Sequence, residues 1–173
     1  DWIRIDDEAQ YEKVLTYDVS TLEPQLSCPQ GVDNVYPISE VLGTPMDEVY
    51  IGSCTNGSLE DLKAAADILR GKKVANHVRV IVVPATNTVF KEAIEKGYIK
   101  DFIEAGCVIS HPCCGLCCGM PYGLMYDDER ILLTANRNFI GRQGTKKTLG
   151  YLSSPAVAAA TALTGVVTDP RTL

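Results

Sequence analysis

The chain has 173 residues, of which 46% are hydrophobic and 22% are charged, and its 16 Lys and Arg against 22 Asp and Glu give a formal net charge of −6. This composition excludes an intrinsically disordered chain, because there is enough apolar surface to offset the entropy of folding. It also excludes a membrane-spanning segment, since no apolar run approaches the roughly 20 residues needed to cross a bilayer. The negative total, without a basic cluster, predicts that the chain binds no nucleic acid.

Seven cysteines, four of them crowded between Cys113 and Cys118, are the most unusual feature of the composition. The chain begins with Asp1 rather than Met, and no signal peptide is recognisable, so we expect a piece or a processed product of a longer, cytoplasmic protein. In a reducing compartment, clustered thiols indicate metal or cluster binding rather than disulfides. Cys28 and Cys107 lie apart and are expected to be buried as small hydrophobic residues.

Residues 1–47 are expected to be an irregular lead-in, with one strand at residues 14–19 and a proline-bearing connection after it, and residues 48–173 to form a single domain. Apolar, partly β-branched runs in the domain predict four strands, at residues 49–53, 78–83, 107–110 and 131–134. Apolar spacing and capping residues predict four helices, the first capped by Ser58 and the second by Asn87, within residues 58–71, 87–96, 98–106 and 154–165.

Strands and helices alternate along this domain, which is typical of a mostly parallel sheet covered by helices, so we predict an α/β fold with three αβα layers. In such sheets ligands bind beyond the carboxyl ends of the strands. The chemically distinctive residues follow the four predicted strands: Cys54, then Thr86 and Asn87, then the cysteine cluster, then Asn136 and Arg137. We therefore expect a functional site at this edge of the sheet.

The cysteine cluster contains one Cys-x-x-Cys pair, Cys114 with Cys117. Two thiolates at this spacing on a Gly-containing loop can converge on one metal centre, and Cys54 supplies a third from the same edge. Three thiolates leave a cluster iron with an open position that can act as a Lewis acid. A structural zinc is the alternative, with Cys113 or Cys118 as its fourth ligand.

The segment 134–144 brings Arg137 and Arg142 together with the carboxamides of Asn136 and Asn138. Guanidinium groups make planar, bidentate contacts with carboxylates, so this loop suits a di- or tricarboxylic acid. The alternative is a solvated polar turn whose arginines pair with surface acids. His77 and His111 are interpreted as ordinary surface or loop histidines.

Three motifs in order resemble the aconitase family, most closely its branch of 3-isopropylmalate dehydratase and homoaconitase large subunits. They are Ile51–Asn56, Cys114–Cys117 followed by Gly119, and Asn136–Arg142, with the lead-in Leu22–Gln25 similar as well. The resemblance covers nearly the whole chain. It implies the fold of the third, C-terminal domain of aconitase, which binds the cluster.

The resemblance implies a [4Fe-4S] cluster with one iron free for substrate, ligated by Cys54, Cys114 and Cys117. It also implies a hydro-lyase that moves a hydroxyl group between neighbouring carbons of a hydroxy acid, most closely 3-isopropylmalate in leucine biosynthesis. Homoaconitase and dimethylmalate-type dehydratases are the alternatives within the family. Cys113 and Cys118 depart from the family pattern, so a ligand set shifted to either of them is a further alternative.

The same resemblance places Asn136 against the cluster and implies that Arg137 and Arg142 bind substrate carboxylates. In this family other catalytic groups lie in two further domains of the large subunit and on a swivel domain, which in this branch is a separate small subunit. We therefore expect those domains, the small subunit and a small hydroxy acid as partners, and no activity from this chain alone. A non-catalytic zinc or iron module and an electron-transfer protein, with Cys113 or Cys118 as a fourth ligand, are the other interpretations.

Overall fold

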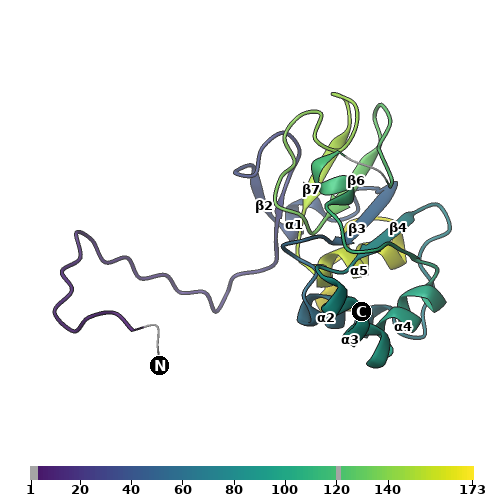
Figure 1. Ribbon diagram of the computed structural model, residues 1–173. Coiled ribbons are helices and arrows are strands. Elements are labelled where there is room, and N and C mark those ends of the chain that lie inside the picture. The colour runs from purple at the N-terminus through teal and green to yellow at the C-terminus, as the bar shows by residue number, and fades with distance from the viewer. Residues whose placement is uncertain (1–3, 120–121) are drawn as a thin grey trace.

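A computed structural model of the chain describes residues 4–119 and 122–173. Within these residues, seven strands form one sheet: β1 (Gln25–Ser27), β2 (Val35–Pro37), β3 (Glu48–Gly52), β4 (Arg79–Val83), β5 (Val108–Ile109), β6 (Arg130–Leu133) and β7 (Leu149–Leu152). Their order is β2-β1-β7-β6-β3-β4-β5 (Figure 1). The strands from β7 to β5 run parallel, and β1 and β2 add an antiparallel edge. The predicted α/β fold with a mostly parallel sheet is confirmed.

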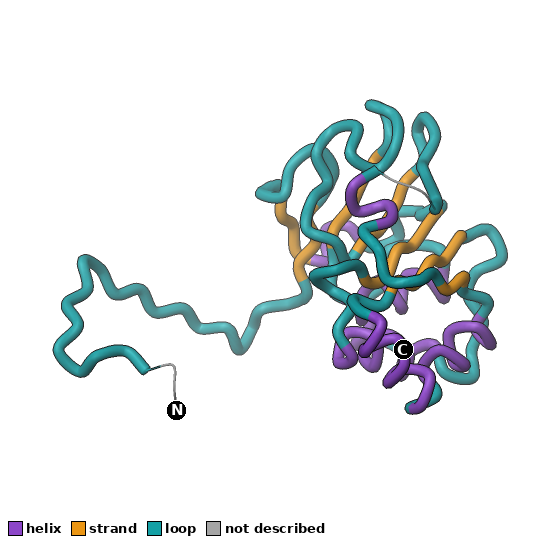
Figure 2. Tube along the Cα trace, in the orientation of Figure 1, coloured by secondary structure: helices purple, strands orange, loops and turns teal. Residues whose placement is uncertain are grey.

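Helices gather on one face of this sheet (Figures 1 and 2). The longer ones are α2 (Leu59–Leu69), α3 (Asn87–Glu95), α4 (Tyr98–Ala105) and α5 (Pro155–Thr164), and the short helix α1 (Ile38–Val41) follows β2. Because α2 packs against α4 and α5, and α3 packs against α4, these helices form a single layer. The third layer, on the opposite face, consists of the 3₁₀ helix η1 (Gly115–Cys118) and the loops around it. A second 3₁₀ helix, η2 (Pro170–Thr172), lies near the end of the chain. None of the described helices is both long enough and apolar enough to cross a membrane.

Both faces of the central strands are buried, and alternate side chains serve the two faces. The side chains that pack against the helix layer are Val49, Ile51, Val80, Val82 and Leu132. Those that pack against η1 and its neighbouring loops are Tyr50, Ile81, Val83, Ile131 and Leu133. This two-sided burial explains why the strands are continuous β-branched and apolar runs rather than alternating ones.

The helix starts follow from local hydrogen bonding, with one correction. At α2, Ser58 Oγ accepts the Asp61 N–H and the Asp61 carboxylate accepts the Ser58 N–H, which is the predicted capping box. At α3 the cap is Thr86, whose Oγ1 accepts the Val89 N–H at 3.1 Å. The predicted cap at Asn87 is therefore wrong by one residue, because the Thr86 hydroxyl is already in place to accept this bond.

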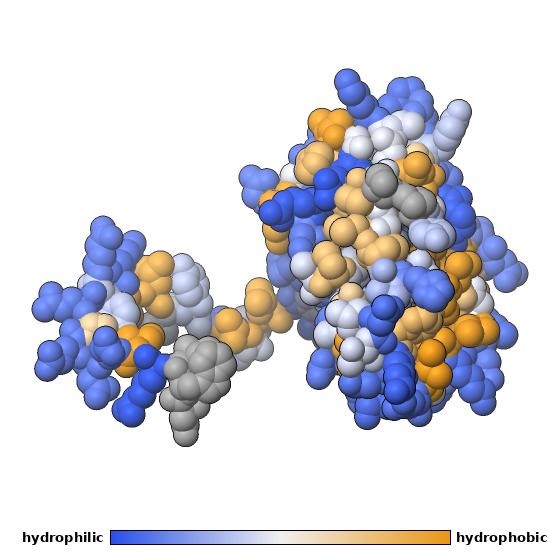
Figure 3. Space-filling view, viewed as in Figure 1, coloured by the Kyte–Doolittle hydropathy of each residue, from blue (hydrophilic) through white to orange (hydrophobic). Residues whose placement is uncertain are grey.

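The lead-in segment differs most from expectation. Residues 4–24 contain no helix or strand, and most of them extend away from the folded body, so the strand predicted at residues 14–19 is wrong (Figure 1). Its apolar side chains are exposed, Val14 to 76% and Tyr17 to 75%. Figure 3 shows hydrophilic and hydrophobic residues mixed along this extended segment. An extended segment becomes a strand only when a neighbour pairs with it. Conversely, β1 and β2 lie within the stretch predicted as a connection, and β7 was not expected.

Candidate functional site

The loops that carry the distinctive residues all leave the sheet at the same edge. The strands β5, β4, β3 and β6 are parallel neighbours, so their carboxyl ends point the same way. Cys54 follows β3, Cys114 and Cys117 follow β5, and Asn136 and Arg137 follow β6. The topology therefore assembles residues separated by up to about 80 positions in the sequence, at the edge where α/β sheets bind ligands.

Cys54 is presented by a strained turn at the end of β3. Gly52 has φ of 98°, and a Cβ there would lie 2.0 Å from the Val83 carbonyl oxygen, so only glycine fits. Ser53 is fully buried with φ of 136°, and its N–H donates to the same Val83 oxygen at 3.1 Å. A non-glycine residue in such a conformation costs about 1–3 kcal/mol and is typical of functional sites. The next residue, Cys54, is exposed.

Thr134, at the end of β6, ties this turn to the neighbouring strand. Its buried Oγ1 accepts the Gly52 N–H at 2.8 Å and lies 3.4 Å from the Asn56 carbonyl, to which it can donate. Nearby, Asn136 Nδ2 donates to Thr55 Oγ1 at 2.8 Å, so the loops after β3 and β6 are joined twice. Sequence reasoning named Asn136 but missed the supporting role of Thr134, because threonine is also an ordinary strand residue.

The loop with Cys114 and Cys117 folds as the single turn η1 over the sheet. Tyr50, which is fully buried on β3, donates its hydroxyl to the Cys114 carbonyl at 3.3 Å. Gly115 has φ of 47°, and a Cβ there would lie 2.3 Å from the Tyr50 hydroxyl oxygen. Cys117 is 8% exposed, whereas Cys114 is exposed at the surface. The loop therefore lies closely against β3.

The thiols of the two loops meet in space. The charge of the Cys54 thiolate and a hydrogen bond with it raise the pKa of the Cys114 thiol, and Cys118 and Cys117 add to this effect. An interaction of this kind requires Cys54 and Cys114 to be neighbours across the two loops. Cys54 and Cys114 therefore lie close across the two loops, and Cys117 belongs to the same turn as Cys114.

The other four cysteines either contact neighbouring polar groups of the protein or are buried in it. Cys118 Sγ donates to the Gly115 carbonyl at 3.5 Å, and Cys113 Sγ lies 3.8 Å from the Ser110 hydroxyl. Cys28 and Cys107 are buried as predicted, to 7% and 8% exposure. Burial raises the pKa of the Cys107 thiol to about 12, so it is an inert apolar side chain at neutral pH.

The donor chemistry of the site fits an iron–sulfur cluster. Among the described residues, no three His, Cys, Asp or Glu side chains converge closely enough to hold a single metal ion. Cys54, Cys114 and Cys117 offer soft sulfur donors from two separate loops. This is the ligand chemistry of a cluster, in which each thiolate reaches a different iron and the sulfurs need not converge on one point.

The loop of residues 134–144, called the arginine loop here, is anchored by Asn138 and lies beside the cysteine loop. Asn138, 2% exposed, donates to the carbonyls of Cys28 at 2.8 Å and Gly150 at 3.1 Å. Arg137 is exposed, and one of its terminal nitrogens donates to the carbonyl of Asn136 at 2.8 Å. The anchored backbone leaves the Arg137 guanidinium at the surface, where a ligand carboxylate can reach it.

Arg142 points back at the cysteine loop. Its Nε donates to the Cys117 carbonyl at 2.5 Å, and its guanidinium carbon lies 5.2 Å from the centroid of the Phe139 ring. The sequence predicted a carboxylate-binding role for Arg142 but not this contact, because nothing in the spacing of the two loops indicates it. The contact joins the Asn136–Arg142 motif to the Cys114–Cys117 motif.

The two histidines have packing contacts outside the cysteine set. His111 meets the Phe90 ring edge-on, with ring centroids 5.8 Å apart. His77 packs so closely on Gly165 that a Cβ there would lie 2.4 Å from the imidazole ring. Both contacts agree with their interpretation as ordinary histidines.

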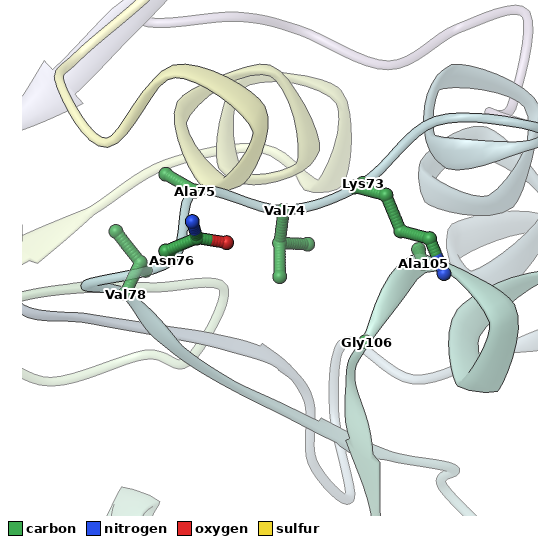
Figure 4. Close-up of a pocket in the computed structure, with 7 residues that line it drawn as sticks. All are labelled: Lys73, Val74, Ala75, Asn76, Val78, Ala105 and Gly106. Carbon is green, nitrogen blue, oxygen red and sulfur yellow. The ribbon is translucent and has the colours of Figure 1, made fainter.

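A pocket of about 470 Å³ lies at the opposite edge of the sheet, before β4 (Figure 4). It is lined by Lys73, Val74, Ala75, Asn76, Val78, Ala105 and Gly106. The Lys73 ammonium is occupied, since it donates to the Glu104 carbonyl at 2.6 Å. The lining therefore lacks paired acids, bases or thiols, and the chemistry of the molecule is concentrated at the cysteine edge.

Comparisons with known proteins agree with the three motifs. Residues 40–165 match the aconitase family (aconitate hydratase). The chain is 50% identical over 166 residues to a probable 3-isopropylmalate dehydratase large subunit from Methanosarcina mazei, covering 96% of this chain and 40% of the relative. It is 51% identical over 169 residues to 3-isopropylmalate dehydratase large subunit 1 from Archaeoglobus fulgidus, covering 98% and 40%.

A third relative, the 3-isopropylmalate dehydratase large subunit from Geobacter metallireducens, is 52% identical over 168 residues, covering 97% of this chain and 39% of the relative. The chain thus spans about 40% of the length of these relatives. The family match extends over most of the domain, from α1 to the end of α5, and includes all the site loops. On this evidence the chain belongs to the aconitase family.

Proposed function

We propose that this chain is the cluster-binding part of an aconitase-type hydro-lyase that interconverts 3-isopropylmalate and 2-isopropylmalate. The observation that supports the proposal is the closeness of Cys54 and Cys114 at the carboxyl edge of the sheet, with Cys117 in the same turn as Cys114 and Arg142 bonded to its backbone. These thiolates would hold a [4Fe-4S] cluster, which when bound supplies a Lewis acid for the departing hydroxyl group.

The other residues of the edge serve the substrate in this proposal. Arg137 and the terminal nitrogens of Arg142 would bind its carboxylates in a planar, bidentate manner. Asn136 is held by Thr55 Oγ1 and would line the cluster side of the same space. The substrate would then lie between the arginine loop and the thiols, with its carboxylates oriented before any bond is broken.

We further propose that proton removal is carried out by other parts of the protein. The relatives are named large subunits, and the chain spans about 40% of their length, which supports partners in the remaining large-subunit domains and in a small subunit. The 173-residue chain alone is then inactive, and the assembled enzyme works in the cytoplasm in leucine biosynthesis. Dehydration of 3-isopropylmalate by the chain alone, followed by the ultraviolet absorbance of the unsaturated product, would contradict this division.

The proposal is tested by anaerobic reconstitution with iron and sulfide, followed by EPR after mild oxidation. A three-iron signal is expected in the unmodified chain. It should be lost in Cys54→Ser, Cys114→Ser and Cys117→Ser, because each variant removes one thiolate. It should persist in the matched controls Cys113→Ser and Cys118→Ser. A folded chain that takes up zinc and no cluster would overturn the proposal.

A further inference from the structure

Two side chains from different parts of the fold hold the backbone of the Cys-x-x-Cys loop. Tyr50, from β3, donates its hydroxyl to the Cys114 carbonyl at 3.3 Å. Arg142, from the loop after β6, donates Nε–H to the Cys117 carbonyl at 2.5 Å. Each of these two contacts therefore falls on the backbone of one of the cysteines assigned to the cluster.

The Tyr50 contact is closely fitted. The phenol is fully buried beneath the loop, in the cluster of side chains that includes Leu116 and Cys117. At Gly115 the phenol oxygen occupies the space that a Cβ would need, so the loop backbone lies directly on the hydroxyl. A tyrosine hydroxyl carries its proton at neutral pH, so it can donate to the loop.

The Arg142 contact uses only part of the guanidinium. Nε is committed to the Cys117 carbonyl, and the plane is supported by the Phe139 ring. Among the described residues, the terminal nitrogens of Arg142 make no hydrogen bond within the protein. One side chain can therefore hold the cysteine loop and still offer its two terminal nitrogens to a ligand.

We propose that Tyr50 and Arg142 are positioning residues that set the Cys114 and Cys117 loop in its cluster-binding conformation before the cluster is present. The inference rests on the proposed function and adds how the ligand loop is shaped. An exposed loop without such contacts would lose conformational entropy when its thiols are captured, which weakens binding. Because Arg142 would also bind a substrate carboxylate, binding of substrate would act on the backbone of Cys117 through the same side chain.

The first test is Tyr50→Phe, which removes a hydroxyl group without opening a cavity. Iron release from the reconstituted chain to a chelator should accelerate between about twofold and tenfold, the range that corresponds to one hydrogen bond. In the cluster-free chain, amide hydrogen exchange of residues 114–119 should accelerate by a similar factor. Tyr98→Phe is the matched control, since Tyr98 is buried in the helix layer away from the loop. Both readouts should be unchanged in it.

The second test compares Arg142→Lys with Arg142→Gln. Lysine keeps the positive charge but lacks the Nε donor and the planar fork, so both variants should release iron and exchange these amides faster. The EPR line shape of the three-iron signal should also change in both, because the loop that carries two of its ligands is displaced. Thermal unfolding measured in parallel separates this effect from general destabilisation.

The outcomes distinguish this inference from the proposed function. If the unmodified chain binds no cluster, the proposed function fails, and the exchange of residues 114–119 still decides whether Tyr50 and Arg142 hold the loop. If the chain binds the cluster but Tyr50→Phe and Arg142→Lys match it in iron release and in exchange, the positioning role is refuted. If Arg142→Lys matched the unmodified chain in both readouts and Arg142→Gln did not, the positive charge would be sufficient, and the role assigned to the Arg142 Nε contact would be refuted.

Discussion

The buried carboxyl group of Glu48 should make the stability of this chain fall as the pH rises. Glu48 lies at the start of β3 with no exposed surface; its Oε2 is 2.9 Å from Arg79 Nε, and its Oε1 has no hydrogen-bond partner among the described residues. Burial raises the pKa of Glu48 to about 7, even though the hydrogen bond and charge of Arg79 oppose the rise. The folded chain therefore holds this proton more tightly than the unfolded chain does.

The sign of the effect follows from the two pKa values of Glu48. In the unfolded chain the group titrates near its ordinary value of 4.5, and in the folded chain near 7. Between these values the folded state carries the extra proton, so its stabilising contribution is complete below pH 4.5 and is lost as the pH rises through 7. At about 1.4 kcal/mol for each tenfold change in proton affinity, the loss is roughly 3 kcal/mol.

Urea unfolding at pH 5, 6, 7 and 8 measures this loss, with Glu48→Gln as the variant that has no proton to lose. Between pH 5 and 8 the unfolding free energy of the unmodified chain should fall by up to roughly 3 kcal/mol more than that of Glu48→Gln. Asp67→Asn is a control, because Lys63 and then Arg70 lower the pKa of this exposed carboxyl group on α2, which has no contact with Glu48 or Arg79 among the described residues. Equal pH dependence in the unmodified chain and Glu48→Gln would refute the reasoning.

Two further predictions concern backbone geometry and a helix cap. Gly52→Ala should destabilise the chain by more than about 1 kcal/mol and change the rate at which Cys54 reacts with a thiol reagent, because its Cβ would meet the Val83 carbonyl. Gly43→Ala is the control, because φ is also positive there but nothing lies within 4 Å of the added Cβ, so only backbone strain should lower the unfolding free energy. An equal loss of unfolding free energy in the two variants would contradict a clash between the Cβ at position 52 and the Val83 carbonyl. Ser58→Ala should lower the unfolding free energy by about 1 kcal/mol through loss of the capping box, measured by urea unfolding; no loss would show that the cap is dispensable.

The sequence by itself determined the central elements and the residues of the site edge. The strands of the parallel core are short apolar runs, and the helices carry apolar side chains at helical spacing between recognisable caps, so local patterns were sufficient. The parallel arrangement then placed Cys54 beside the Cys114 and Cys117 loop, because consecutive crossovers leave the carboxyl ends of strands together. For this reason the candidate thiols follow from the order of the elements along the chain.

Tertiary structure alone decided the features that depend on distant neighbours. Three-residue strands such as β1 and β2 have almost no pattern of their own and exist because β7 pairs with β1, whereas residues 14–19 have a strand-like composition and no partner within the described chain. The contacts of Tyr50 with Cys114 and of Arg142 with Cys117 join residues 64 and 25 positions apart. Hydrogen bonds over such separations depend on how the backbone is brought together in space, and local propensity carries no information about that.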